Sequence, residues 1–412
     1  MINILTYDQI DQQQWQELVQ SSPVATWFQT DEAYRFYQSV GGMQAFVYGV
    51  AEVECKVESV KCKDLENSAA ETTASTPYTL HPTPALKGVI VGYITHERNP
   101  LKQYFTRRAI IYGGPLLAND ISETALAELL KAVKAMGNGQ WVIDEETNSQ
   151  SPMANRPQKI QSPIANSPIY IESRNFHDYS KWRSIFEANG FAYQPHLNYH
   201  VDTTSLDLAQ SRIGKHRWKY IRLSMRDGAK IVENPSIEQV QAFYTILQDL
   251  YQTKVKTPLW SWEFFEQLYR VQHAKYILVE LDGQIVGGTA CVCLPGKAVY
   301  EWYACGLDNC RDDIRPLSVA IWGEMQYAAE NGYPLFDFMG AGKPDEPYGV
   351  RDFKAEFGGE LVEHGRFLCI RKPLLYWIGK MGVKWLKGRK RPMKQSLPLH
   401  STPYTKKLKT FA

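Results

Sequence analysis

Apolar residues form short runs at matching places in the two halves of this chain. In the first half, these runs predict strands at 89–94, 109–112 and 141–144, with a helix at 123–136 before the last strand. In the second half, they predict strands at 275–280, 284–290, 299–303 and 335–339, with a helix at 317–331 before the last strand. The same order of elements occurs twice, which predicts two domains of one design.

Asp282 and Gly283 join the first two strands of the second half, and this pair is a strong β-hairpin signal. A helix that then crosses to another strand adds a parallel strand to antiparallel ones. The predicted fold class is therefore α/β with mixed (α+β) sheets. Further helices are predicted at 175–188 and 237–250. Gly190 stands where a helix C-cap glycine is expected.

Two stretches interrupt this pattern. Residues 56–84 are rich in Ser, Thr, Ala, Glu and Pro, and residues 147–167 are rich in Asn, Ser, Gln and Pro. Both predict disordered insertions in surface loops. We therefore expect an N-terminal domain at 1–180, a C-terminal domain at 181–372 and a tail at 373–412.

The tail is basic and amphipathic. From Arg371 to the end there are twelve Lys or Arg residues and no acidic residue, so the first 370 residues carry a net charge of −10. A helix here would place Leu374, Trp377, Ile378, Met381 and Trp385 on one face and Lys380, Lys384 and Lys387 on the other. This pattern favours peripheral contact with an anionic membrane surface. A tRNA-binding arm and a core-packing helix are the alternatives.

Composition and motifs exclude several classes of function. The 412 residues are 44% hydrophobic and 22% charged, as in a soluble globular protein. An apolar span of membrane length and a signal peptide are both missing from the sequence, so we expect a cytoplasmic location. Seven irregularly spaced cysteines predict free thiols, with Cys291 and Cys293 on one face of a buried strand. No metal-ligand spacing, nucleophile elbow or P-loop occurs in the sequence, so neither a metal nor a bound cofactor is expected. DNA is not an expected partner.

A glycine-rich loop follows the strand at 334–339. Glycines allow a backbone to approach a ligand closely, and cations beside them suit an anionic or polar substrate. The residues with useful chemistry are Gly340, Gly342, Lys343, Tyr348, Arg351 and Lys354. The pattern predicts a substrate loop, and the alternative is a turn whose charges are only solvated.

A second cationic segment runs from Lys215 to Arg222 and interleaves basic with aromatic residues. This composition suits a phosphate or diphosphate beside a sugar or base. Helical or strand periodicity would send about half of these side chains to solvent. We choose Arg217, Tyr220 and Arg222 as candidate substrate-binding residues.

Three segments carry a resemblance to one family. Phe353-Lys354 followed by Phe357-Gly358 resembles the C-terminal signature of the Fem (FemAB) family of peptidoglycan bridge-forming aminoacyltransferases. Residues 215–231 and, more weakly, 27–34 resemble two other segments of that family, in the same order. The resemblance implies two tandem GNAT-like domains of the acyl-CoA N-acyltransferase type. It also implies an enzyme that forms an amide bond on an amine of a cell-envelope precursor.

The resemblance also implies roles for individual residues. Lys354 would stabilise the oxyanion of the reacting carbonyl, with Arg351 and Tyr348 as catalytic neighbours. The loop pattern, and not the resemblance, gives Lys343, Gly340 and Gly342 as candidate substrate-binding residues. Near 27–34 the chain lacks the lysine that the family pattern suggests, and Arg35 is the nearby substitute. The nature of the acceptor stays open at this point.

The family implies aminoacyl-tRNA as donor and a peptidoglycan precursor, or another amine, as acceptor. The alternative is a GNAT N-acyltransferase that uses acyl-CoA, whose diphosphate needs a glycine-containing loop at a helix N-terminus. Residues 310–319 hold that place here with two aspartates and no glycine, and residues 112–115 of the first half form a tight turn instead. A further alternative is a non-catalytic protein that binds an envelope glycan or lipid precursor.

Overall fold

The computed structural model describes residues 1–53, 84–95, 97, 99–137, 167–307 and 310–388. The strands are β1 (Ile2–Leu5), β2 (Met43–Glu52), β3 (Ala85–Thr95), β4 (Arg108–Gly113), β5 (Leu116–Leu117), β6 (Tyr170–Asn175), β7 (Ala192–Gln194), β8 (Leu197–Asp202), β9 (Lys230–Val232), β10 (Ala274–Leu281), β11 (Gln284–Leu294), β12 (Ala298–Gly306), β13 (Leu335–Asp337), β14 (Glu360–Glu363) and β15 (Arg366–Ile370). The helices are α1 (Gln12–Ser21), α2 (Asp31–Ser39), α3 (Pro100–Thr106), α4 (Glu123–Ala135), α6 (Arg183–Ala188), α7 (Leu206–Arg212), α8 (Lys215–Arg226), α9 (Ile237–Leu250), α10 (Trp262–Tyr269), α11 (Pro316–Glu330), α12 (Gly349–Ala355) and α13 (Pro373–Gly388).

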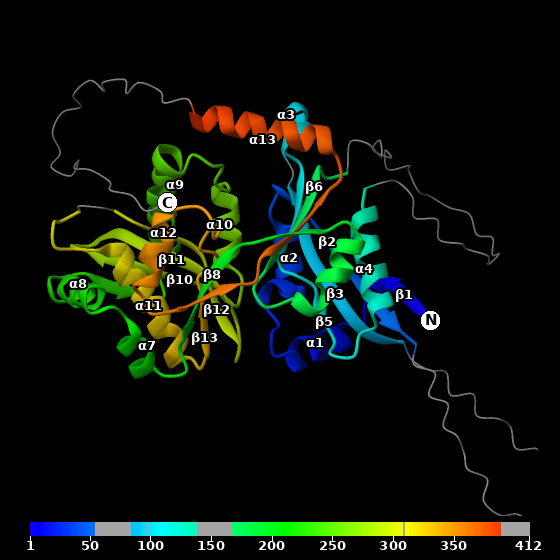
Figure 1. Ribbon diagram of the computed structural model, residues 1–412. Helices are drawn as coiled ribbons and strands as arrows, with labels where there is room; N and C mark the ends of the chain where they lie inside the picture. Colours follow the sequence, from blue (N-terminus) through cyan, green and yellow to red (C-terminus); the bar gives the residue numbers. More distant parts are fainter. Residues whose placement is uncertain (54–83, 96, 98, 138–166, 308–309, 389–412) are drawn as a thin grey trace, which may run out of the picture.

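These elements form two sheets with helices on both faces, one sheet in each half of the molecule (Figure 1). The first sheet has the strand order β1-β2-β3-β4-β6-β15-β7, with β5 paired to β3. The second has the order β14-β8-β13-β12-β11-β10-β9. Each sheet combines antiparallel pairs with a parallel pair, β4 with β6 and β12 with β13. The predicted class, α/β with mixed sheets, is confirmed.

The repeated order of elements is also present. In the second half, β10 and β11 form a hairpin closed by Asp282 and Gly283, whose φ angles of 51° and 78° match the left-handed turn that twisted strands prefer. The helix α11 then crosses from β12 to β13. In the first half, β3, β4 and α4 occupy their predicted places, and β6 is the parallel partner of β4. The predicted strand at 141–144 lies outside the described residues.

The two halves exchange their last strands. β8 follows β7 along the chain, yet it pairs with β13 and β14 in the second sheet. β15 follows β14, yet it pairs with β6 and β7 in the first sheet. The sequence-based limits at 180 and 372 assign β7 and β15 to the C-terminal domain. Strand pairing instead links both to the first sheet, because pairing partners far apart in sequence leave no trace in the local hydrophobic pattern.

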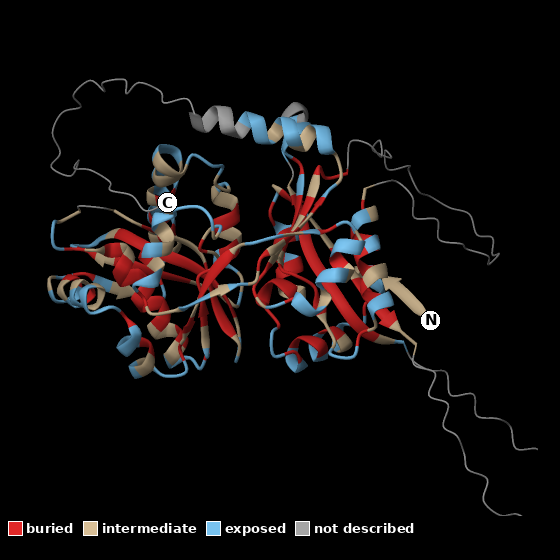
Figure 2. Ribbon diagram, viewed as in Figure 1, coloured by how far each residue is buried: buried red, intermediate tan, exposed pale blue. Residues whose placement is uncertain are grey.

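The two halves meet through a shared aromatic core. Phe28 and Phe36 of the first half lie against Trp302 of the second, with ring centroids 5.1 and 5.9 Å apart. Phe36 also contacts Phe264 at 5.2 Å. Figure 2 shows that the strands of both sheets are largely buried, whereas exposed residues concentrate on the helices and loops. The halves therefore share one core cluster that fixes their relative position.

Two helix predictions have different outcomes. The helix at 237–250 is confirmed as α9. The prediction at 175–188 is wrong for its first part, because Asn175 ends β6 and the α-helix begins only at Arg183. Asn175 pairs with Gly113 of β4, and a 3-10 turn at Ser180–Trp182 leads into the helix. Gly190 follows α6 with a φ of 86°, which confirms the expected glycine cap.

Several predicted segments lie beyond the description. The insertions expected at 56–84 and 147–167 fall outside the described residues except for Pro84 and Ser167, so their disorder stays a prediction. The tail is described as α13 up to Gly388. Among the described helices, none has the length and apolar character needed to cross a bilayer.

Candidate active site

Lys354 lies on α12, and its ammonium group is buried at the carboxyl end of β13. Nζ donates hydrogen bonds to the carbonyl oxygens of Phe338 at 2.7 Å and Gly340 at 2.9 Å. It lies 3.6 Å from Oε1 of Glu301 on β12. Burial lowers the pKa of Lys354, and the neighbouring Glu301 opposes this shift. The ammonium thus has two hydrogen-bond acceptors and one ion-pair partner.

Arg351, one turn earlier on α12, donates hydrogen bonds to the backbone of the glycine-rich loop. Its Nε donates to the carbonyl oxygen of Ala341 at 2.9 Å, and its Nη2 donates to the carbonyl oxygens of Lys343 and, at 3.1 Å, Glu346. Charge-assisted hydrogen bonds of this kind are stronger than neutral ones. Arg351 and Lys354 together hold the loop against α12.

The glycines of this loop are required by its shape. Gly342 has a φ of 78°, and a Cβ placed there would lie 2.8 Å from the ring of Tyr348. Gly340 has a φ of 147°, a conformation that other residues rarely adopt. Lys343 is exposed and pairs with Glu346 at 3.0 Å. The structure therefore brings all six predicted loop residues together.

Two buried carboxyl groups near Lys354 escaped the sequence analysis. Burial raises the pKa of Glu301 on β12 and of Glu324 on α11, and the charge of Glu301 raises that of Glu324 further. Oε2 of Glu301 is buried without a hydrogen-bond partner among the described residues. One signal was present in the sequence, because Glu301 interrupts the apolar strand predicted at 299–303.

Arg217 on α8 faces the protein and contacts the end of α12. Its Nε donates to Oε2 of Glu356 at 3.0 Å, and its Nη1 donates to Oγ of Ser318 at 2.8 Å. The guanidinium lies 4.5 Å from the ring centroid of Phe353. Three partners therefore already engage the guanidinium that we chose as a substrate contact.

The other predicted binding residues are spread over the surface. Tyr220 is half-buried, with the guanidinium of Arg315 5.3 Å from its ring centroid, whereas Arg222 is exposed on α8. Arg35 lies in the other half, on α2, where its exposed side chain pairs with Asp31 at 2.7 Å. Only the loop and α12 residues form a compact group, and the substrate roles of the remainder stay predictions.

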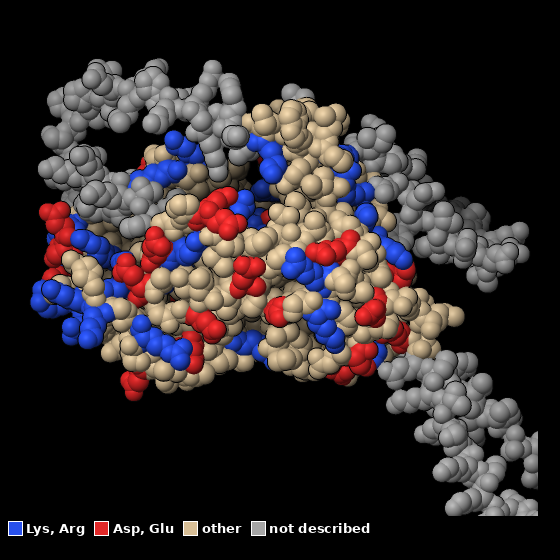
Figure 3. Space-filling view, viewed as in Figure 1, with Lys and Arg blue, Asp and Glu red and all other residues tan. Residues whose placement is uncertain are grey.

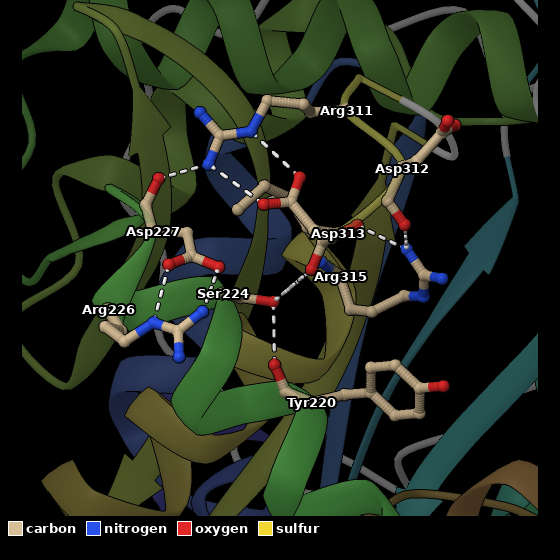
Figure 4. A network of polar contacts seen from close by, with 9 residues as sticks. Tyr220, Ser224, Arg226, Asp227, Arg311, Asp312, Asp313 and Arg315 are labelled. Atoms are coloured by element: carbon tan, nitrogen blue, oxygen red, sulfur yellow. Dashed lines mark hydrogen bonds and ion pairs between the residues drawn. The ribbon is translucent and has the colours of Figure 1, made fainter.

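Protein groups occupy the loop that leads from β12 into α11 (Figure 4). Oγ of Ser224 on α8 accepts a hydrogen bond from the backbone N–H of Arg315 at 2.9 Å, which caps the start of α11. Arg311 Nε donates to Asp313 at 2.9 Å, and the exposed Asp312 lies beside them. A helix N-terminus attracts anions, so two carboxylates at this place disfavour a diphosphate.

The corresponding turn of the first half is also filled. Gly113 and Gly114 have φ angles of 77° and 75°. The hydroxyl group of Tyr179 donates to the carbonyl oxygens of Gly113 at 2.8 Å and Pro115 at 2.6 Å. Gln29 Nε2 donates to both glycine carbonyl oxygens. The left-handed glycines form the expected tight turn, and Tyr179 and Gln29 occupy its carbonyl oxygens.

The described cysteine, histidine and carboxylate side chains form no group of three that could hold a metal ion. Cys291 and Cys293 are buried free thiols on the same face of β11, as predicted. Their burial raises the pKa of Cys291 and makes it a poor nucleophile.

Comparison with known proteins assigns the fold. Residues 215–354 match the family model of the acetyltransferase (GNAT) domain. No curated protein sequence matches the chain. The crystal structure of FemX is 14% identical over 91% of this chain and 99% of its own, with a TM-score of 0.59.

Two further solved structures are more distant. The C-terminal domain of a putative lysylphosphatidylglycerol synthetase from Agrobacterium fabrum is 14% identical over 72% of this chain and 85% of its own, with a TM-score of 0.45. A tandem GNAT protein from the clavulanic acid biosynthesis pathway is 8% identical over 89% and 98%, with a TM-score of 0.48. The likeness to FemX confirms the predicted Fem-like tandem GNAT fold, and at 14% identity it is evidence for the fold alone.

Proposed function

We propose that this protein, an N-acyltransferase or aminoacyltransferase with two tandem GNAT-like domains, forms an amide bond on an amine of a peptidoglycan precursor. The observation that carries the proposal is the placement of Lys354. Its ammonium lies at the carboxyl end of β13, behind the glycine-rich loop and 3.6 Å from a buried carboxylate. A cation and a proton acceptor side by side are what acyl transfer to an amine requires.

In the proposed reaction, the acceptor amine attacks the carbonyl carbon of an activated ester. The carbonyl oxygen becomes a tetrahedral oxyanion, and Lys354 Nζ stabilises it in place of one backbone carbonyl partner. Glu301, whose pKa is raised by burial, takes the proton of the attacking amine through its unpaired Oε2. The C–O bond of the ester then breaks, and the departing hydroxyl oxygen takes that proton from Glu301.

We propose aminoacyl-tRNA as the donor, although the GNAT fold accommodates either this donor or acyl-CoA. The support is the β12–α11 loop, where Asp312 and Asp313 would repel the diphosphate of coenzyme A. The exposed cations of α8, including Arg222, suit a polyanionic donor. Acyl-CoA remains the alternative donor.

The test is transfer of labelled amino acids from a charged tRNA pool, and of acetyl groups from acetyl-CoA, onto muramyl-peptide precursors. The Lys354→Ala variant should lower kcat about 10²–10³-fold, as the loss of an oxyanion donor does. The Lys354→Arg variant keeps the charge and should retain part of the rate. The matched control is Lys131→Ala, whose exposed lysine on α4 pairs with Glu128 at 2.7 Å; it should leave kcat unchanged.

Each other outcome contradicts a stated part of the proposal. Incorporation of label from acetyl-CoA alone would mean that the donor is acyl-CoA and not aminoacyl-tRNA. Equal turnover by Lys354→Ala and the parent would mean that Lys354 has no catalytic role. If a lowered melting temperature accounts for the whole loss of rate in Lys354→Ala, the lysine only holds the loop.

A non-catalytic binding protein is the second candidate, because the ammonium of Lys354 already has two hydrogen-bond acceptors and an ion-pair partner in the structure. In that case the wild-type chain would transfer nothing from either donor, and Lys354→Ala would weaken binding of the precursor instead. We also propose peripheral contact with the inner face of the membrane through α13, which would bring the site close to a lipid-linked acceptor.

A further inference from the structure

A second polar site lies between the two halves, on the opposite face of the second sheet from Lys354. A cavity of about 250 Å³ is lined by Phe176 and His177 of the first half and by Tyr300, Asp337 and His364 of the second. Tyr300 and Glu301 are neighbours on β12, so their side chains point to opposite faces of the sheet. The cavity is therefore separate from the proposed transfer site, and it exists only where the halves meet.

The carboxylate in this cavity is already satisfied. Asp337 is fully buried and accepts hydrogen bonds from Asn198 Nδ2 at 2.6 Å and from the backbone N–H of Met339 at 2.6 Å. It also accepts from Nε2 of His200 at 3.1 Å. Although burial opposes the charged imidazole, Asp337 raises the pKa of His200. Nε2 of His200 faces Asp337, and its Nδ1 makes no hydrogen bond to the described residues.

The remaining polar groups of the cavity include the imidazoles of His177 and His364, the hydroxyl group of Thr26 and the ammonium group of Lys297. Burial lowers the pKa of His177 to about 3, and burial together with the charge of His200 lowers that of His364. Nδ1 of His177 is buried and lacks a hydrogen-bond partner among the described residues. Among the described residues, Lys297 donates a hydrogen bond only to the carbonyl oxygen of Gln20, at 3.4 Å. Asp337 is already satisfied by its three partners, whereas Lys297 makes no ion pair with the described residues.

We infer that this cavity binds a small ligand with one carboxylate and a compact apolar part. The carboxylate would accept hydrogen bonds from His200, His177 and Lys297, because a carboxylate is an acceptor only and these groups can all donate. The apolar part would lie against Phe176 and Tyr300, as in most small-molecule sites. A volume of about 250 Å³ suits an amino acid or a dipeptide.

The test uses the full chain and isothermal titration calorimetry with alanyl-alanine, its C-terminal amide and inorganic phosphate. Alanyl-alanine should bind, and the amide, which lacks the carboxylate, should bind at least tenfold more weakly. The His200→Gln and Lys297→Met variants should each weaken alanyl-alanine at least tenfold with melting temperatures close to that of the parent. The control His216→Gln changes an exposed histidine on α8 and should bind as the parent does.

Three results would overturn the inference: no binding of alanyl-alanine at millimolar concentration, equal binding of the dipeptide and its amide, or preferred binding of phosphate. Unchanged affinity in both His200→Gln and Lys297→Met would place any binding elsewhere. Because the titration needs no turnover, its outcome is independent of whether the transfer reaction is found.

Discussion

At the scale of single residues, Arg217 and Arg222 lie in the same basic segment of the sequence but differ in their surroundings. Arg217 is held by Glu356, Ser318 and the ring of Phe353, whereas Arg222 is exposed. Arg217→Ala should lower the free energy of unfolding by about 2–3 kcal/mol, because it removes hydrogen bonds to a charged group. Arg222→Ala should change it by less than about 0.5 kcal/mol. Urea denaturation of both variants measures these differences.

The same pair tests substrate binding. A raised KM in Arg222→Ala, with unchanged stability, would support its predicted contact with substrate. An Arg217→Ala variant as stable as the parent would contradict the structural role that its three partners indicate.

The sequence predicted one side of the candidate site better than the other. Gly340, Gly342 and Lys354 could be found because turn glycines and the Phe-Lys signature are local features. Glu301 and Glu324 could not be placed beside Lys354, because β12, α11 and α12 meet only after folding. The histidine cavity was equally hidden, since His177, His200 and His364 come from three distant segments.

At the scale of elements, an acidic residue holds the exchanged strand β15 in the first sheet. Glu172 of β6 accepts a hydrogen bond from Arg366 of β15 at 2.8 Å and lies 2.8 Å from Arg174. Burial opposes ionisation of Glu172, but the two guanidinium groups outweigh it and lower the pKa to about 2 from the ordinary 4.5. A lowered pKa means that folding favours the charged carboxylate.

This pKa predicts acid sensitivity. The stabilisation is fully present above the unfolded pKa of about 4.5 and is lost as the pH falls through about 2, a difference of about 3 kcal/mol. Glu172→Gln should therefore be clearly less stable than the parent at pH 7, and the gap should shrink between pH 4.5 and 2. Urea midpoints across this range give the measurement. A gap independent of pH would show that charge at Glu172 does not hold β15.

The helix α13 and its neighbour α3 form an exposed apolar surface. The exposed fractions are 70% for Leu374, 60% for Trp377, 41% for Ile378, 49% for Met381, 48% for Tyr104 and 41% for Phe105. Figure 3 shows uncharged side chains gathered over these two helices, with basic side chains beside them. Such a surface suits the interface of an anionic bilayer, where aromatic side chains insert and cations approach lipid phosphates.

Vesicle binding tests this surface. The full chain should sediment with vesicles that contain anionic lipid, and salt should weaken the binding. Trp377→Ser should reduce binding at least tenfold. Leu361→Ser is the matched control, because Leu361 is 46% exposed on β14, away from this surface. Equal losses in the two variants, or no sedimentation of the parent, would refute membrane contact through α13.

At the scale of the whole molecule, the duplication was predictable and the exchange of strands was not. The hairpin signal at Asp282 and Gly283 and the crossing helix α11 are encoded locally. β8 and β15 occupy equivalent places in their halves, and nothing in their local pattern states which sheet each joins. The sheet that each strand joins is decided only in the folded molecule, by strand pairing within each sheet and by the aromatic core between the two sheets.

The exchange of strands also affects the order in which the protein can fold during synthesis. Arg174 of β6 pairs with Arg366 of β15, so the ribosome must make almost all of the described chain before the first sheet can close. From the synthesis of β6 to that of β15, at about 5–20 residues per second, the wait lasts about 10–40 s. Throughout it, β6 and β7 present open edges to other chains, and unpaired edges promote aggregation. We therefore expect the nascent N-terminal half to need a chaperone that covers these edges until β15 emerges.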